Sequence, residues 1–285
     1  MDNLKTDLQV QHSFQPKTIG KVIWTHEDMM NSLPEFRSLY QSRPFDSNDG
    51  GMKAPHMFLT WFLLRQLNPE TIIESGVFKG YGTWLIEQAC PNAQIKCLDP
   101  NLDQIEFKGK NASYSSQDFE SLDARDCDPE KTLCFFDDHQ NSYKRLQLMK
   151  WFGLKYAIFE DNYPPGQGDC YSLKKILMKS GHFYAKKASG VKEYIRDRIG
   201  HFLGFQNTEI SILPREADYH YLLENLKVYW EGPPLFKLAH TRWGDNWDEE
   251  KYPTQEPLLA DNPQDDLYSE ADAYTWLCYV ELNTK

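Results

Sequence analysis

The chain has no hydrophobic run long enough to cross a membrane. Its longest apolar stretch, residues 57–64, is far shorter than the roughly 20 residues that span a bilayer, and the polar residues 1–7 lack the apolar core of a signal peptide. None of the six cysteines forms a C-x-x-C pair, and the sequence contains no internal repeat or low-complexity tract. We therefore expect a cytoplasmic protein with reduced thiols and no membrane partner.

The chain also lacks an excess of basic residues. It carries 31 Lys and Arg against 42 Asp and Glu, a formal net charge of −11, whereas tight binding to a nucleic-acid backbone requires a basic face. With 285 residues, of which 40% are hydrophobic, the chain can bury a substantial core. This composition favours a compact enzyme whose partner is a small molecule or a neutral glycan and not a nucleic acid, and a homodimer is its candidate assembly.

The most informative stretch is the apolar segment 71–75, which is followed by a glycine-rich turn and a helical segment from residue 84. Gly76, Gly80 and Gly82 lack a Cβ, so the backbone can take positive φ and allow a ligand to approach, beside the free N–H groups of the new helix. A dinucleotide-binding turn needs G-x-G-x-x-G, but these glycines follow the order G-x-x-x-G-x-G. The stretch predicts a cofactor crevice of another kind, and an ordinary turn without a cofactor remains the alternative.

The spacing of Glu74, Gly76 and Gly80 resembles motif I of the class I S-adenosylmethionine-dependent methyltransferases. The acid before the turn suits the ammonium group of that cofactor. Asp99 ends the next predicted strand, 94–99, and is placed to bind the ribose hydroxyls. Asp118 ends a short predicted strand, and in this family an acid near this point accepts from the adenine amino group. The predicted cofactor residues are therefore Glu74, Gly76, Gly80, Asp99, Asp118 and His139. A surface role for Asp118 stays open.

Polar residues also follow two later apolar segments, 132–136 and 156–159. Asp137 and Asp138 follow the first segment, and Asp161 and Asn162 follow the second. In a parallel sheet the carboxyl ends of the strands meet at one edge, so these side chains should converge beside the cofactor. Oxygen ligands on rigid strand ends suit Mg²⁺, Mn²⁺ or Ca²⁺. A purely structural role, in which the acids bind helix N-termini or arginines, is the alternative.

These two phrases, Phe-Asp-Asp-His ending at His139 and Phe-Glu-Asp-Asn ending at Asn162, resemble the metal-binding elements of catechol-type O-methyltransferases. The general arrangement of these elements along the chain is also similar to that of macrocin-type sugar O-methyltransferases and of cephalosporin-hydroxylase-like proteins. The resemblance implies that Asp138, Asp161 and Asn162 bind the metal and that His139 lines the cofactor. The catechol enzymes place a lysine base two residues after this histidine, where this chain has Asn141. Asp138, His139 and Lys144 are the remaining candidates for the catalytic group.

The fold that the resemblance implies is an α/β, Rossmann-like three-layer sandwich with a mostly parallel sheet. Its last strand, predicted at 274–282, should be antiparallel. We expect an N-terminal arm over 1–53, with short helices at 27–30 and 34–40, and a methyltransferase-like domain over 54–285. An irregular extension around 181–272 should contain a strand at 210–213 and a helix at 219–229.

The resulting hypothesis is a divalent-metal-dependent O-methyltransferase that uses S-adenosylmethionine and acts on a small hydroxylated molecule, with sugars among the candidates. One alternative keeps the cofactor and replaces the metal by Asp138 or His139 as general base. An iron-dependent hydroxylase is an alternative of another class, for which His26 and Asp28 supply an H-x-D pattern. A non-catalytic binding module is the third.

Overall fold

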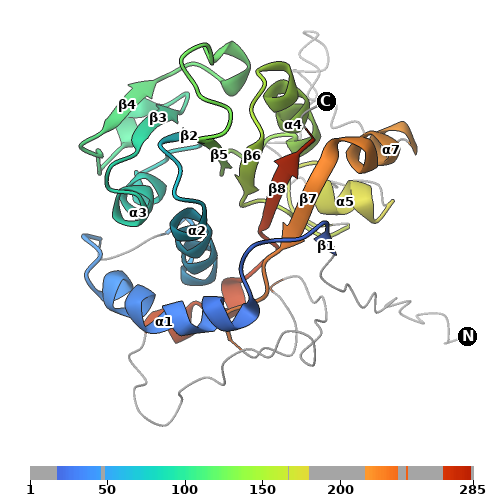
Figure 1. Ribbon diagram of the computed structural model, residues 1–285. Coiled ribbons are helices and arrows are strands. Elements are labelled where there is room, and N and C mark those ends of the chain that lie inside the picture. The colour runs from blue at the N-terminus through green and yellow to red at the C-terminus, as the bar shows by residue number, and fades with distance from the viewer. Residues whose placement is uncertain are drawn as a thin grey trace, which may run out of the picture.

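The computed structural model describes residues 18–45, 49–165, 167–179, 216–236, 242 and 266–283. Within these residues an eight-stranded sheet has the strand order β1-β7-β8-β6-β5-β2-β3-β4 (Figure 1). The strands are Thr18–Ile19 (β1), Thr71–Ser75 (β2), Gln94–Leu98 (β3), Ala112–Ser115 (β4), Thr132–Phe136 (β5), Tyr156–Phe159 (β6), Leu226–Glu231 (β7) and Cys278–Leu282 (β8).

Strands β2 to β6 are parallel: β2 pairs with β3 and β5, β3 with β4, and β5 with β6. Strand β8 inserts antiparallel between β6 and β7, and β1 pairs antiparallel with β7. The predicted sheet, mostly parallel with an antiparallel last strand, is confirmed. The last strand begins at Cys278, four residues later than predicted.

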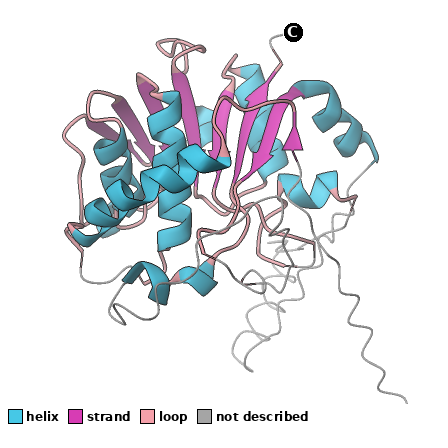
Figure 2. Cartoon of the chain, turned by 60° about the horizontal axis from the view of Figure 1, so that its bottom comes forward, coloured by secondary structure: helices cyan, strands magenta, loops and turns pink. Residues whose placement is uncertain are grey.

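Helices cover both faces of the sheet (Figures 1 and 2). Residues of α1, α2 and α3 belong to one hydrophobic cluster, and residues of α4, α5 and α7 belong to the other. This gives the three layers that the sequence predicted. The helices are His26–Gln41 (α1), Ala54–Leu67 (α2), Tyr81–Ala89 (α3), Ser142–Trp151 (α4), Leu173–Leu177 (α5), Glu216–Asn225 (α7) and Asp266–Ser269 (α8).

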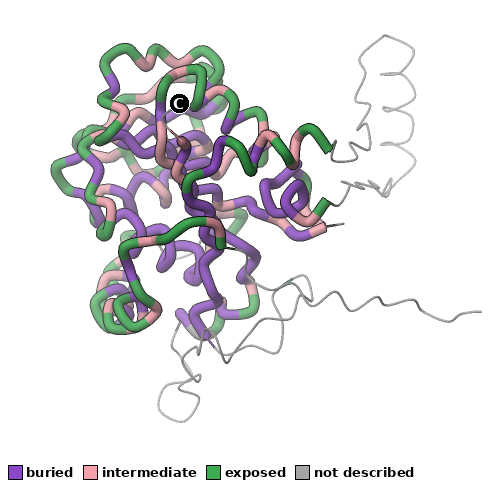
Figure 3. The backbone as a smooth tube through the Cα atoms, turned by 45° about the vertical axis from the view of Figure 1, so that its right-hand side comes forward, coloured by how far each residue is buried: buried purple, intermediate pink, exposed green. Residues whose placement is uncertain are grey.

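Buried residues gather in the interior of the molecule (Figure 3), and the central strands belong to them. Every residue of β5 is buried, and its side chains alternate between the two clusters: Phe135 packs with the α2 layer and Phe136 with the α4 layer. Such strands read as continuous apolar runs because neither face meets water. This is why the sequence located β2, β5 and β6 correctly.

Helix α1 is a single helix, whereas the sequence predicted two short ones around Pro34. Thr25 and Asp28 form a capping box at its start, with Thr25 Oγ1 accepting from the Asp28 N–H at 3.1 Å. The buried residues Met29, Leu33, Phe36 and Tyr40 repeat at helical spacing and join the same core as α2. This packing outweighs the hydrogen bond that Pro34 cannot make.

The predicted helix 219–229 is wrong in its second half. Helix α7 ends at Asn225, and Leu226–Glu231 forms strand β7 between β8 and β1. Val228, Tyr229 and Trp230 are β-branched or aromatic residues that fit a buried strand. The strand predicted at 210–213 lies outside the described residues, as does most of the extension. No helix in the described ranges is long and apolar enough to cross a membrane.

Candidate functional site

The turn after β2 has the positive φ angles that the sequence predicted, but for a different reason. Gly76 has φ 90° and Gly80 has φ 92°. A Cβ on Gly76 would lie 2.0 Å from the carbonyl oxygen of Asp137, and one on Gly80 would lie 2.3 Å from that of Phe107. Both glycines are therefore required by the close approach of the chain's own backbone.

A cavity of about 340 Å³ opens at the carboxyl ends of β2, β3 and β5. It lies where the sequence predicted a cofactor crevice, at the sheet edge where parallel α/β folds bind ligands. Its lining includes the predicted residues Gly76, Asp99, Asp118, Asp138 and His139, together with Gly50, Gly51, Phe78, Gln117 and Arg145.

Asp99 is buried at the end of β3 and holds the glycine-rich turn. One carboxylate oxygen accepts from the N–H groups of Val77 and Phe78, each at 2.9 Å, and the other accepts from Asn101 N at 2.8 Å. Each oxygen has lone pairs for about two hydrogen bonds, so Oδ1 can accept one more. The predicted ribose contact thus stays compatible with this geometry, in addition to a role in shaping the turn.

Arg145 is the main site residue that the sequence reasoning missed. It lies on the first turns of α4 and is buried, and its guanidinium forms two hydrogen bonds to Asp118, at 2.7 and 2.6 Å. Its Nε donates to Asp138 Oδ2 at 2.9 Å, an oxygen that also accepts from Ser75 Oγ at 2.7 Å. Arg145 holds the pKa of Asp118 down, at about 2. Two of the predicted acids are therefore ion-paired to one arginine.

The predicted ammonium ligand, Glu74, lies away from the cavity lining. Its side chain is fully buried between β2 and α3, where Oε2 accepts from Thr83 Oγ1 at 2.6 Å and from Cys97 Sγ at 3.2 Å. A Cβ on Gly82 would lie 2.5 Å from Glu74 Oε1, so the third glycine of the turn makes room for this carboxyl group.

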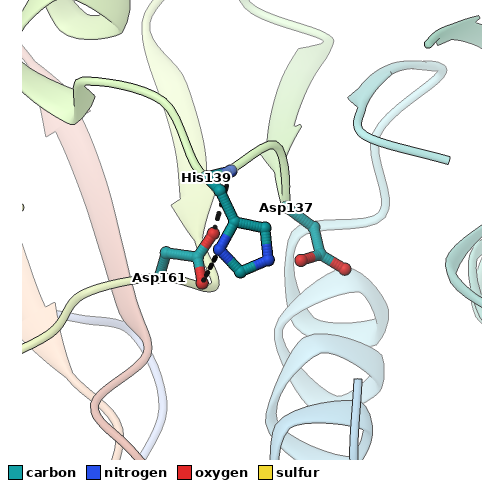
Figure 4. Close-up of side chains that lie close together, drawn as sticks. All are labelled: Asp137, His139 and Asp161. Atoms are coloured by element: carbon teal, nitrogen blue, oxygen red, sulfur yellow. Dashed lines mark hydrogen bonds and ion pairs between the residues drawn. The ribbon is translucent and has the colours of Figure 1, made fainter. Parts of the chain in front are cut away.

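A second group of polar residues converges at the cavity, whose lining includes two of them, Asp137 and His139. Ligand atoms of Asp137, His139 and Asp161 all lie within 4.8 Å of one another, and Figure 4 shows the imidazole between the two carboxylates. His139 has φ 51°, and its backbone N–H donates to Asp161 Oδ2 at 3.1 Å. Its Nδ1 lies 3.1 Å from Asp169 Oδ1 and 3.5 Å from Asp161 Oδ1. Two carboxylates and an imidazole form a set that can hold a divalent cation.

The electrostatics of this group are those of crowded acids, of which Asp161 is buried and Asp137 and Glu160 are half-buried. Burial raises the pKa of Asp137 and of Asp161, and the charge of the neighbouring Glu160 raises both further. Burial alone would also raise the pKa of Glu160, but His56, whose Nδ1 lies 2.6 Å from Glu160 Oε1, lowers it to about 2. Asp161 Oδ1 is buried, with His139 Nδ1 3.5 Å away as its ion-pair partner. A cation would relieve the repulsion between these acids.

Of the predicted metal set, only Asp161 belongs to this cluster. Asp138 is paired with Arg145 as described above, and both amide atoms of Asn162 are engaged: Nδ2 donates to Tyr229 Oη at 2.8 Å and Oδ1 accepts from Lys174 N at 2.9 Å. The predicted catalytic alternative Lys144 is exposed and donates to Glu120 Oε2 at 2.6 Å, outside the cavity lining.

No protein-family model matches the sequence, and no curated protein matches it. Among solved structures, the chain is similar to CmcI with Mg and SAM (18% identity, 44% of this chain and 64% of that chain, TM-score 0.32). It is similar to the SAH-bound methyltransferase PaMTH1 of Podospora anserina (16%, 50% and 74%, 0.33) and to the O-methyltransferase TomG of Streptomyces achromogenes with SAM (14%, 66% and 80%, 0.33). Similarities this low do not bear on function, so the proposal below rests on the chain's own residues.

Proposed function

We propose that this chain is a divalent-metal-dependent O-methyltransferase that uses S-adenosylmethionine and acts on a small hydroxylated molecule, with sugars among the candidate acceptors. The observation that carries the proposal is the cluster of Asp137, His139 and Asp161, which lies at the edge of a cavity lined by Gly76 and Asp99. Methyl transfer to a hydroxyl needs a cofactor cavity and a site for the acceptor oxygen next to each other, and these two features supply both.

The donor set fits a hard cation such as Mg²⁺ or Mn²⁺, with Ca²⁺ as a further candidate. Asp137 and Asp161 would each supply a carboxylate oxygen and His139 a ring nitrogen, and water would fill the remaining positions. When bound there, the cation would lower the pKa of the acceptor hydroxyl and orient its oxygen. Glu160 adds a third negative charge behind these ligands, held in place by His56.

We infer that the cofactor would occupy this cavity. Asp99 Oδ1 keeps capacity for a ribose hydroxyl, and Asp118, fixed by Arg145, is a further acceptor in the lining. Glu74 does not line the cavity, so we assign it to the structure of the turn. The acidic residues around the site suit the positive sulfonium group and disfavour an acceptor with many negative charges.

The partners that we propose follow from the same charges. The acceptor is a small molecule or a glycan, and neither a nucleic acid nor a membrane is a partner. A homodimer stays our candidate assembly.

His139 is a candidate general base in the metal-independent alternative. Its Nδ1 lies 3.1 Å from Asp169 Oδ1, and this hydrogen bond is the largest cause that raises the pKa of His139 to about 9. The imidazole is therefore protonated at neutral pH and can accept a proton from a hydroxyl only near or above that pKa, which disfavours this alternative. The two mechanisms differ in their response to a chelator, which abolishes activity only if the cation takes part.

Asp137 and Asp138 are neighbours in the sequence, but only Asp137 belongs to the cluster, so the pair gives a matched test of the metal site. We would titrate S-adenosylmethionine and Mn²⁺ separately into the wild type, Asp137→Asn and Asp138→Asn by calorimetry. We expect the wild type to bind both, and Asp137→Asn to lose at least about tenfold in Mn²⁺ affinity, because it removes a charged ligand. Asp138→Asn should retain Mn²⁺ affinity, because Asp138 is committed to Arg145.

Three results would change the proposal. If only Asp138→Asn weakens Mn²⁺ binding, the metal set predicted from sequence is right and the cluster in Figure 4 is not the site. If the wild type binds S-adenosylmethionine and no cation, the metal-independent mechanism holds. If it does not bind S-adenosylmethionine, the chain is not a methyltransferase of this kind.

A further inference from the structure

One wall of the 340 Å³ cavity comes from a part of the chain that lies far from the turn after β2 in the sequence. Gly50 and Gly51 line the cavity, and they belong to the loop that joins α1 to α2. A Cβ on Gly50 would lie 3.5 Å from two atoms of the Phe78 ring, and Phe78 is another residue of the lining. The position of this loop therefore helps to set the shape of the cavity.

Helix α2 begins three residues after Gly51 and has no cap of its own. Lys53 occupies the N-cap position, and its side chain makes no capping hydrogen bond. Pro55 lies in the first turn, where its missing N–H needs no partner within the helix. Ala54, however, is 0% exposed, so its N–H group cannot be satisfied by water and needs a partner from elsewhere in the chain.

That partner is Glu270, 216 residues after Ala54 in the sequence. Its Oε2 accepts from Ala54 N at 2.7 Å and from Tyr40 Oη at 2.8 Å, and its Oε1 lies 3.9 Å from Lys53 Nζ. Tyr40 is buried near the end of α1, so Glu270 joins the two helices that the loop connects. A carboxylate at a helix N-terminus also interacts favourably with the helix dipole.

The loop has other anchors, but they act through side chains away from the cavity lining. The ring of Phe45 packs against Tyr81 of α3, with centroids 3.8 Å apart, and the side chain of Met52 is buried. The two glycines in the cavity wall have no side chain that could hold them. Their placement depends on these anchors and on the hydrogen bonds of Glu270.

We propose that Glu270 is a positioning residue for this cavity. By capping α2 and tying it to α1, Glu270 holds Gly50 and Gly51 in the cavity wall before the cofactor binds. A preformed wall raises affinity, because a ligand that must first order its site binds more weakly by the fraction of molecules in which the site is formed. The identity of the ligand rests on the proposed function, whereas the placement of the loop by Glu270 does not.

The test compares the loss of two helix caps in the full chain. Glu270→Ala removes the cap of α2, and Thr25→Ala removes the Oγ1 that accepts from Asp28 N at 3.1 Å and caps α1. Thr25 lies at the other end of α1 from Tyr40, about 22 Å along the helix axis, and does not line the cavity. Glu270→Gln is the conservative variant, because its amide oxygen can accept both hydrogen bonds.

Calorimetry measures the affinity of each variant for S-adenosylmethionine. We expect Glu270→Ala to bind it about fivefold more weakly than the wild type, a factor that corresponds to about 1 kcal/mol and to the loss of one helix cap. Thr25→Ala should lower the melting temperature by a similar amount to Glu270→Ala, about 2–3 °C, and leave the affinity unchanged. Glu270→Gln should bind within about twofold of the wild type.

Two-dimensional ¹H–¹⁵N NMR measures the position of the loop without the cofactor. The amide resonance of Gly50 is sensitive to the ring current of Phe78 beside it. It should move in Glu270→Ala and stay in place in Thr25→Ala, because only the first variant releases the start of α2.

The proposal is overturned if Glu270→Ala and Thr25→Ala bind S-adenosylmethionine equally, or if the Gly50 resonance is the same in Glu270→Ala and the wild type. If the wild type does not bind S-adenosylmethionine, the proposed function fails, and the NMR comparison alone decides whether Glu270 places the loop. The two proposals can therefore fail separately.

Discussion

The carboxyl group of Glu74 offers a test in which the sequence and the structure lead to different expectations. The sequence resemblance places it at the ammonium group of the cofactor, whereas the structure buries it between β2 and α3 against Thr83 and Cys97. Burial is the largest cause that raises its pKa, from 4.5 to about 7, against the opposing effect of its two hydrogen bonds. The substitution Glu74→Gln keeps the shape of the side chain and removes the titration.

The magnitude follows from linkage between protonation and folding. Between pH 4.5 and 7 the folded state holds a proton that the unfolded chain has released, so the free energy of unfolding falls as the pH rises through this window. The difference between the two pKa values corresponds to about 3 kcal/mol, of which about 2.5 kcal/mol is lost between pH 5 and pH 8. The contribution of Glu74 to stability is fully present below pH 4.5.

Urea unfolding of the wild type and Glu74→Gln at pH 5, 6, 7 and 8 measures this effect. The stability of Glu74→Gln relative to the wild type should increase by about 2–3 kcal/mol over the series. The affinity for S-adenosylmethionine should change little. A stability difference that is constant with pH, together with a large loss of cofactor affinity, would show that Glu74 binds the cofactor as the sequence predicted.

Three further predictions test close contacts and burial in the fold. Gly76→Ala should lower the free energy of unfolding by about 4 kcal/mol, from the positive φ and the clash with the Asp137 carbonyl, as measured by urea denaturation. Lys174 and Glu231 form an ion pair in which each side chain is 1% exposed, so Lys174→Met should cost about 3–5 kcal/mol, and adding Glu231→Gln should recover part of it. All six cysteines are free and buried, so Ellman's reagent should label none in the native protein and all six in urea.

The layout of the sheet could be predicted because its signals are local. The apolar runs of β2, β5 and β6 end in acids or glycines, and positive φ at Gly76 and Gly80 follows from the absence of a Cβ. The carboxyl ends of parallel strands necessarily share an edge, so the convergence of the acids followed from the fold class alone.

The partners of these acids could not be predicted in the same way. Arg145 meets Asp118 and Asp138 only because α4 packs over the end of β5, and an arginine four residues after Asn141 gives no signal of that contact in the sequence. The partner of Glu160 is His56, more than a hundred residues earlier on α2. Contacts between distant segments depend on how the layers pack, which local patterns do not record.

The choice between Asp137 and Asp138 depends on the alternation of side chains along β5. Phe135 faces the α2 layer and Phe136 the α4 layer, so continued alternation places Asp138 on the side of α4 and Arg145. Because β5 is buried on both faces, polar and apolar residues do not alternate along it, so its sequence does not reveal this parity.

The alternation of side chains along β5, which places Asp138 beside Arg145, leads to a separate prediction for Arg145→Met. The variant leaves Asp138, whose side chain is 11% exposed, without its cation, so the free energy of unfolding should fall by about 2–4 kcal/mol in urea. Adding Asp138→Asn should restore part of the loss, because a neutral amide tolerates burial better. Mn²⁺ affinity should stay near that of the wild type in both variants, since Asp137, His139 and Asp161 are untouched. If Arg145→Met instead strengthens Mn²⁺ binding and Asp138→Asn cancels the gain, then Asp138 becomes a ligand once released, and Arg145 is what excludes it from the metal set.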